Sequence, residues 1–214
     1  MEKRVIEDIK SWIQQKNNSA SHDYYHLIRV YNNAVFIADN ENVAAEIKYI
    51  AQISALLHDV GHKKKSYLVK DDHEQEGNEI IISLLKNMKI ESAIIDRVLF
   101  CINNHRYSQD DSIGEDRIEL QILRDADRLD ALGAIAIART FSYDSDRPIY
   151  IPDDVPKAVY DGISNSSINH IIEKILKLTP ESFYMNSSRH MARERLKFVQ
   201  LFVDEFFREW NGIC

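Results

Sequence analysis

The sequence predicts an all-α fold, a single compact helical domain, from three observations. Apolar residues recur at spacings of three and four along most of the chain, which is typical of amphipathic helices. No segment shows the strict alternation of apolar and polar residues that marks a half-buried strand. The length of 214 residues and the hydrophobic content of 44% suit one globular domain over residues 1–214.

The apolar pattern predicts the first three helices directly. The segment 4–13 places large apolar side chains on one helical face, namely Val5, Ile6, Ile9, Trp12 and Ile13. Ser21 is a candidate N-cap for a second helix that runs to about residue 38. The segment 43–60 is apolar nearly all round, which predicts a buried central helix that ends at Gly61.

Further helices are expected at 72–88, 91–104, 116–141, 165–178 and along the final stretch to about residue 212. Small residues are frequent in 126–138, and small side chains let helices approach closely, so we expect a second central element there. Large apolar side chains recur along the last helix at Met191, Phe198, Phe202, Phe206 and Trp210. That helix is expected to pack on the motif-bearing core, at about 20–140, or alternatively to form an oligomer contact.

The segment 143–157 is expected to be irregular. It contains three of the four prolines, spaced so that no helix can continue through them. A loop of this length in a compact domain often covers a site or contacts a partner. A plain surface connection is an equally good interpretation.

Composition argues against several classes of protein. The formal net charge of −7 disfavours a broad nucleic-acid-binding surface, which normally requires a basic face. No apolar stretch reaches the roughly 18 residues of a membrane span, and the charged N-terminal segment lacks the apolar core of a signal peptide. Cys101 and Cys214 lie far apart and outside any metal-type spacing, which favours free thiols in a reducing, cytoplasmic setting.

Two histidines and two aspartates form the most informative pattern in the chain: His26, His58, Asp59 and Asp127. The adjacent pair His58-Asp59 ends an apolar helical run, so both side chains are expected to point into protein, where polar groups need partners. Two imidazoles and two carboxylates suit a divalent ion of borderline hardness, with coordination positions left open. The pattern therefore predicts a metallohydrolase.

Three segments that carry these residues resemble the HD-domain superfamily of metal-dependent phosphohydrolases. They are HDYYHLIRV at 22–30, ALLHDVGH at 55–62 and RDADRLDALG at 124–133. Their matching order makes the resemblance far more specific than His-Asp alone. The resemblance implies that His26, His58, Asp59 and Asp127 bind the metal, and that metal-activated water hydrolyses a phosphate bond. It implies Mn²⁺ or Mg²⁺ as the metal, with Fe, Ni, Co or Zn as alternatives.

The sequence departs from three branches of that superfamily. The guanosine tetraphosphate hydrolases typically continue the HD pair with Glu-Asp, where this chain has Val60 and Gly61. The 5′-deoxynucleotidases have a catalytic Glu three residues after the HD aspartate, where this chain has His62. The Gly-Tyr-Pro element of the cyclic-dinucleotide phosphodiesterases is absent. The chain looks closest to the small stand-alone bacterial HD hydrolases, some of which are similar to nucleoside triphosphate pyrophosphohydrolases.

Arg29 is a candidate phosphate ligand. It lies one helical turn after His26, so both side chains project from the same face. A guanidinium there can clamp a phosphate through two parallel hydrogen bonds. An ion pair with Asp23 or Glu46 is the alternative.

His62 and Lys63 are candidates next to the HD pair. His62 lies four residues after His58, on the same face if the helix continues through Gly61, and there it would donate to a phosphate or protonate a leaving group. Otherwise it complements the helix dipole. Lys63, with the two lysines that follow it, forms either a positive rim or a solvated turn.

His73, His105 and Asp130 complete the set of candidate substrate-binding residues. His73 and His105 lie between the HD pair and Asp127, where two-metal members of the superfamily place additional histidines. They are expected to contact the substrate's phosphates or to hold a second ion. Asp130 lies one turn after Asp127 and would orient a ligand or water, or lie on the helix surface.

These residues predict a phosphohydrolase that acts on a small phosphorylated metabolite. A nucleotide is the expected substrate, with NTP or dNTP cleaved to the monophosphate and pyrophosphate. The alternatives are a nucleotide phosphomonoesterase, a cyclic-nucleotide phosphodiesterase, and a non-catalytic sensor that binds metal and nucleotide. No nucleic-acid or membrane partner is expected, whereas a homo-oligomer is possible.

Overall fold

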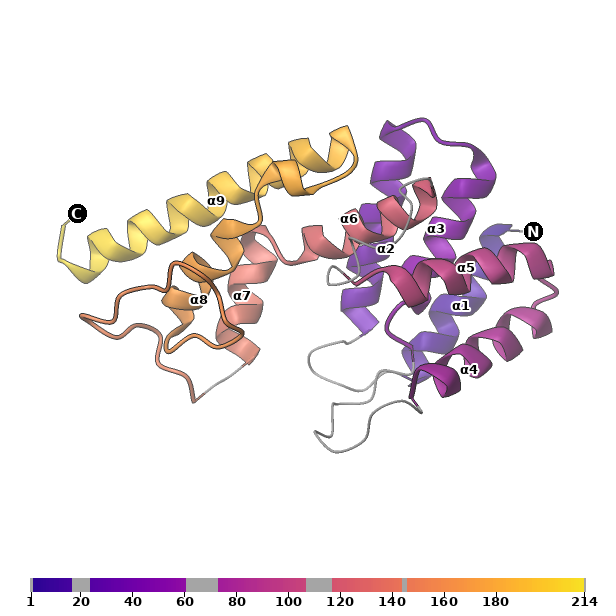
Figure 1. Cartoon of the computed structure of the whole chain (residues 1–214), viewed down its shortest axis with the longest axis horizontal. Coiled ribbons are helices and arrows are strands. Elements are labelled where there is room, and N and C mark those ends of the chain that lie inside the picture. Colours follow the sequence, from indigo (N-terminus) through magenta and orange to yellow (C-terminus); the bar gives the residue numbers. More distant parts are fainter. Residues whose placement is uncertain (1, 17–23, 61–72, 107–116, 144–145, 214) are drawn as a thin grey trace. The chain divides into compact units, whose positions relative to one another are not determined.

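The computed structural model describes residues 2–16, 24–60, 73–106, 117–143 and 146–213 (Figure 1). Every regular element within these ranges is a helix, which confirms the predicted all-α fold. The chain divides into two compact units, residues 1–127 and 128–214, which are described separately below. The single domain expected from the length stays a prediction.

The first unit consists of α1 (Glu2–Lys16), α2 (Tyr24–Asn40), α3 (Ala45–Leu57), α4 (His73–Asn87), α5 (Ser92–Asn104) and most of α6 (Ile118–Asp130). The central element is α3, which packs against α1, α2 and α5 (Figure 1). Its apolar residues are buried on all sides, as the sequence predicts, and they include Ile50, Ile53, Leu56 and Leu57. This helix delivers the HD pair to the interior of the unit.

The central helix ends earlier than expected. The prediction extended it over 43–60, but α3 stops at Leu57. The backbone N–H of Val60 then donates to the Leu57 carbonyl at 3.0 Å, in the tighter three-residue pattern that is common at helix ends. His58 and Asp59 consequently lie in the turn that follows the helix, with the backbone of His58 still in the helical region.

The second unit contains α7 (Gly133–Tyr143), α8 (Ser167–Glu173), the 3₁₀ turns η2 (Ile175–Lys177) and η3 (Pro180–Ser182), and α9 (Asn186–Trp210). Helix α7 packs against both α8 and α9. No regular element lies in 146–166, which agrees with the irregular segment expected at 143–157 within the described part. This loop is anchored where the N–H of Ser167 donates to the Pro148 carbonyl at 2.9 Å.

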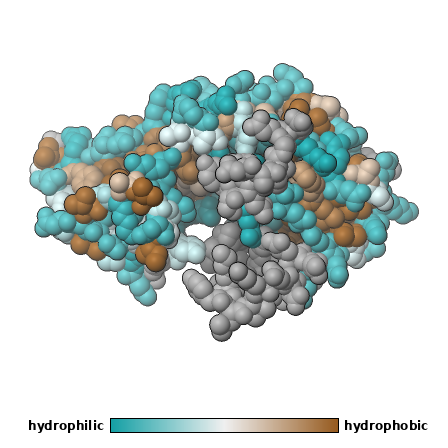
Figure 2. Space-filling view, viewed as in Figure 1, coloured by the Kyte–Doolittle hydropathy of each residue, from teal (hydrophilic) through white to brown (hydrophobic). Residues whose placement is uncertain are grey.

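The last helix is long, as predicted, but its buried face differs from the expected aromatic stripe. Its buried residues are small or β-branched, namely Ser188, Ala192, Val199 and Val203. Phe198 and Trp210 are about half exposed, at 50% and 52%. The Trp210 ring instead contacts Tyr150 of the loop, with ring centroids 4.9 Å apart. Figure 2 shows hydrophobic side chains scattered among hydrophilic ones over this unit.

Two predicted helices are interrupted. The expected helix 116–141 is two helices, because α6 ends at Asp130 and α7 begins at Gly133, whose φ is +80°. A left-handed residue cannot continue a right-handed helix. The expected helix 165–178 is α8 followed by a 3₁₀ turn. None of the helices in the described ranges is long and apolar enough to cross a membrane.

Gly133 is expected to tolerate no side chain without loss of stability. A Cβ atom at this position would lie 3.2 Å from Cγ of Arg195, in addition to the strain of positive φ. We expect Gly133→Ala to lower the free energy of unfolding by about 1–2 kcal/mol. Gly162→Ala is the matched control, since Gly162 has φ +102° but open space around it. Urea unfolding should show the larger loss for Gly133→Ala, and an equal loss would contradict the role of Arg195.

Candidate metal centre

Two histidines enter the interior of the first unit from different helices. His26 lies on α2 and is 4% exposed, and His58 follows α3 and is 1% exposed. The Nδ1–H of His58 donates to the Ala55 carbonyl at 2.9 Å. This hydrogen bond selects the tautomer whose Nε2 carries a lone pair, as is usual for histidines that bind metals.

The Nε2 atom of His58 is a buried polar atom without a hydrogen-bond partner among the described residues. A buried acceptor left unsatisfied is costly, so such atoms in folded proteins usually have a ligand or water. A divalent cation would satisfy this lone pair directly. The unpartnered Nε2 of His58 therefore fits the role of a metal ligand at this position.

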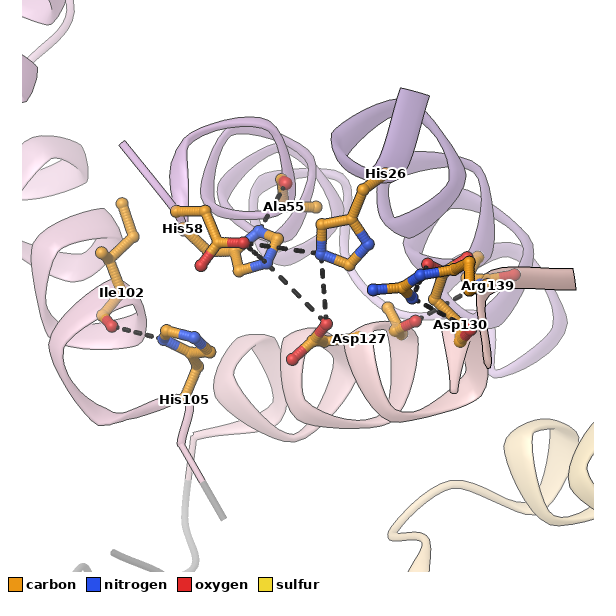
Figure 3. A network of polar contacts seen from close by, with 11 residues as sticks. His26, Ala55, His58, Ile102, His105, Asp127, Asp130 and Arg139 are labelled. Atoms are coloured by element: carbon orange, nitrogen blue, oxygen red, sulfur yellow. Dashed lines mark hydrogen bonds and ion pairs between the residues drawn. The ribbon is translucent and has the colours of Figure 1, made fainter. Parts of the chain in front are cut away.

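Two carboxylates face the two imidazoles, and Figure 3 shows one of them, that of Asp127, beside His26 and His58. Asp59 Oδ2 lies 3.6 Å from Nε2 of His26 and 3.5 Å from Nε2 of His58. Asp127 Oδ1 lies 3.5 Å and 3.8 Å from the same two nitrogens. Ligands about 2.1 Å from a tetrahedrally held ion are about 3.4 Å apart. The four side chains therefore enclose a space of the size that one ion requires.

Hydrogen bonds hold α6, which carries Asp127, against its neighbours. Asn33 Nδ2 on α2 donates to the Ala126 carbonyl at 3.0 Å, and both residues are buried. The Arg124 guanidinium donates to the Asn104 carbonyl at 2.9 Å and so links α6 to the end of α5. Neither positioning residue was predicted from the sequence. Asn33 carried a signal, because it lies two helical turns after His26 on the same apolar face.

Comparison with known proteins identifies the family. The HD domain family matches residues 23–132, more than half of the chain, and this range contains all four candidate ligands. The chain belongs to the HD-domain family. The divalent metal that HD domains bind is consistent with the His/Asp cluster described above.

Solved structures extend the similarity of this HD domain over the full chain. An HD-superfamily hydrolase from Bacillus thuringiensis is 29% identical, with 99% of each chain covered and a TM-score of 0.75. A predicted HD-superfamily hydrolase from an uncultured Thermotogales bacterium is 30% identical, with 97% of this chain and 92% of that one covered and a TM-score of 0.63. YpgQ from Bacillus subtilis, in complex with ADP, is 27% identical, with 98% and 100% coverage and a TM-score of 0.71. The chain is an HD-superfamily hydrolase.

A third histidine lies beside the ligand set of the HD domain. His105 follows α5, is 7% exposed, and its ring centroid lies 5.1 Å from that of His58. Its Nδ1–H donates to the Ile102 carbonyl at 2.6 Å, so its Nε2 is also the unprotonated nitrogen. Together with His58 and Asp127 it forms a second group of ligand atoms close enough to hold an ion.

Electrostatics keep the His105 ring neutral. Burial, followed by the neighbouring His58, lowers the pKa of His105 to about 4, well below its usual value near 6.5. The ring is therefore unprotonated at neutral pH and offers a lone pair rather than a charge. That His105 contacts the substrate's phosphates or holds a second ion stays a prediction.

The other candidates of the HD motif have different outcomes. Arg29 is half-buried on α2, and His73 is the first residue of α4. His62 and Lys63 lie outside the described residues, and the helix on which the His62 argument depended already ends at Leu57. Glu46, one of the partners considered for Arg29, pairs with Arg97.

Asp130 forms an ion pair with Arg139, and both residues belong to the second unit. Its carboxylate is 3% exposed, and Oδ2 accepts a hydrogen bond from Nη1 of Arg139 at 2.8 Å (Figure 3). This ion pair was not predicted from the sequence. Its partner lies beyond the break at Gly133, where helical spacing no longer predicts which side chains meet.

Proposed function

We propose that this HD-domain hydrolase is a metal-dependent phosphohydrolase that cleaves nucleoside triphosphates to monophosphates and pyrophosphate. The observation that carries the proposal is the orphaned Nε2 of His58 within a cluster of one further imidazole and two carboxylates. Support for a nucleotide comes from YpgQ, a relative over its whole length, whose structure contains ADP.

His26, His58, Asp59 and Asp127 would hold the ion. When bound, a divalent ion lowers the pKa of water and offsets negative charge that develops on phosphorus. Asp59 is 8% exposed, so its carboxylate lies in a largely water-excluded position, where it would accept a proton from the attacking water. Asp127 is more open, at 36%, which leaves an approach for the substrate from its side.

Neighbouring side chains would position the phosphates. Arg29 and His105 are proposed as phosphate contacts, since one follows His26 by a turn of α2 and the other lies beside His58. His62 as proton donor, and Lys63 and His73 as further contacts, stay predictions from the sequence. For Asp130, the ion pair with Arg139 supports a structural role instead.

The role of His105 is testable by a conservative substitution. Gln cannot supply the imidazole lone pair but keeps a polar side chain in the pocket. We expect His105→Gln to retain one divalent ion per chain and to lower kcat/KM at least about tenfold. Metal content by elemental analysis and steady-state kinetics check this. Loss of all bound metal would instead place His105 in the primary ligand set, and unchanged kinetics would exclude it from the site.

A turnover panel tests the proposed reaction. Purified protein with Mn²⁺ or Mg²⁺ is supplied with ribo- and deoxyribonucleoside triphosphates, monophosphates and cyclic nucleotides, and pyrophosphate and orthophosphate are measured separately. We expect pyrophosphate from triphosphates. Orthophosphate from monophosphates would replace the proposal with a nucleotidase. Nucleotide-induced stabilisation without any product would replace it with a metal- and nucleotide-binding sensor.

A further inference from the structure

The second unit contains a group of cationic and aromatic side chains that the metal centre does not use. It consists of Arg147, Tyr160, His170 and Lys174, hereafter the Arg147 cluster. Two of its members come from the loop 146–166, His170 lies on α8, and Lys174 directly follows that helix. The Tyr160 and His170 rings meet edge to face with centroids 5.5 Å apart. The Lys174 ammonium lies 5.4 Å from the Tyr160 ring centroid.

Two buried nitrogens in this cluster have no hydrogen-bond partner among the described residues. They are Nε of Arg147 and Nδ1 of His170. With the described residues, the guanidinium makes a single long hydrogen bond, from Nη2 to the Thr140 carbonyl at 3.5 Å. Because buried polar groups are nearly always satisfied, two such nitrogens in one cluster indicate a polar ligand at this cluster.

The charge of the cluster indicates the sign of that ligand. Among the described residues, no carboxylate forms an ion pair with Arg147 or Lys174 within 4.0 Å, so that part of the chain leaves both positive charges uncompensated. The nearby carboxylate of Glu173 is already used, since it accepts hydrogen bonds from the Lys157 N–H at 2.8 Å and from the Ser164 hydroxyl. An anion would compensate the excess charge.

The pKa of His170 responds to the same surroundings. Burial, followed by the charges of Lys174 and Arg147, lowers the pKa of His170 to about 4, against an opposing effect of Glu173. A bound anion favours the protonated imidazole and would reverse part of this shift. Binding of an anion would therefore favour protonation of the His170 imidazole, which could then donate a hydrogen bond from each ring nitrogen.

We propose that Arg147, His170 and Lys174 form a phosphate-binding site in the second unit. A guanidinium, an imidazole and an ammonium together offer more N–H donors than a carboxylate can accept, whereas a phosphate has three acceptor oxygens with higher charge. Tyr160 supplies one wall. The phosphate belongs either to the substrate or to a separate phosphorylated effector, since both present the same chemistry.

Binding of inorganic pyrophosphate to the metal-free chain tests the site without any turnover. Calorimetry in the presence of a chelator should show binding to the unmodified chain, at least tenfold weaker in Arg147→Gln and in Lys174→Gln. Lys177→Gln is the matched control, because Lys177 is an exposed lysine one turn further along. Equal binding by all variants, or binding that requires the metal, would overturn the proposal. A failed hydrolysis assay would leave this result intact.

A second measurement uses the unmodified chain and so avoids variants that fold poorly. The imidazole of His170 is followed by NMR across pH, and its signal is assigned by its loss in His170→Gln. Saturating pyrophosphate should raise the pKa of His170, and an unchanged pKa would contradict the site.

Kinetics then distinguish the two sources of the phosphate, once the panel has identified a substrate. If the substrate supplies it, Arg147→Gln raises KM and pyrophosphate competes with the substrate. If a separate effector supplies it, KM in the absence of effector is unchanged, and pyrophosphate alters the rate of the unmodified chain without competing. Either result requires the phosphate-binding site. If pyrophosphate changes neither the KM nor the rate of the unmodified chain, the proposed site is contradicted.

Discussion

Asp59→Ala is expected to abolish turnover and to weaken metal binding by more than about 100-fold. The carboxylate is 8% exposed and lies within 3.6 Å of the Nε2 atoms of both His26 and His58. Loss of one charged ligand removes both the affinity and the Lewis acidity of the site, which corresponds to a fall in kcat of about 1,000-fold or more.

Asp96→Ala provides the matched control for this substitution. Asp96 is an exposed carboxylate on α5, so its removal changes the net charge equally without touching the ligand set. Metal content and kcat should equal those of the unmodified chain. Retention of both metal and turnover by Asp59→Ala would refute the metal centre as described.

Thermal unfolding gives an independent measure of the same site. An ion that binds only the folded chain stabilises it, by about 2.7 kcal/mol at a free concentration of 100 times Kd. Added Mn²⁺ should therefore raise the Tm of the unmodified chain and of Asp96→Ala, but not that of Asp59→Ala. An equal rise in all three would mean that the ion binds elsewhere.

The proximity of the four candidate ligands could be predicted from sequence because each of these residues belongs to a local pattern. His26 and the HD pair occur in helical segments with clear apolar periodicity, and the interior position of those segments follows from that periodicity. The structure brings their side chains together with Asp127. His105 also lies at this centre, although spacing alone could not decide between substrate contact and metal ligation.

Features that depend on contacts between distant segments could not be predicted. The break at Gly133 is not visible in a segment rich in small helix-forming residues, because it requires a left-handed φ and the approach of Arg195 from α9. The end of α3 at Leu57 is equally hidden, since the stop signal that the sequence offers is Gly61, four residues further along. This error matters for function, because it removes the helical geometry on which the role of His62 depended.

Asp130→Asn is expected to destabilise the fold rather than to alter substrate binding. The carboxylate is 3% exposed, and its partner Arg139 is 38% exposed. Removal of one member of a fully buried pair costs about 3–5 kcal/mol. Since water screens Arg139 in part, we expect a loss of about 2 kcal/mol in the free energy of unfolding, measured by urea denaturation.

A double-mutant cycle with Arg139→Gln separates the ion pair from any role in substrate binding. If the two residues act mainly on each other, Arg139→Gln destabilises similarly and the double variant is little worse than either single one. Additive losses would contradict the pairing. At a temperature where all variants are folded, a purely structural Asp130 leaves KM unchanged. A raised KM in Asp130→Asn but not in Arg139→Gln would show that Asp130 contacts the substrate. Both variants lose the ion pair, so a difference in KM between them must come from a direct contact of Asp130.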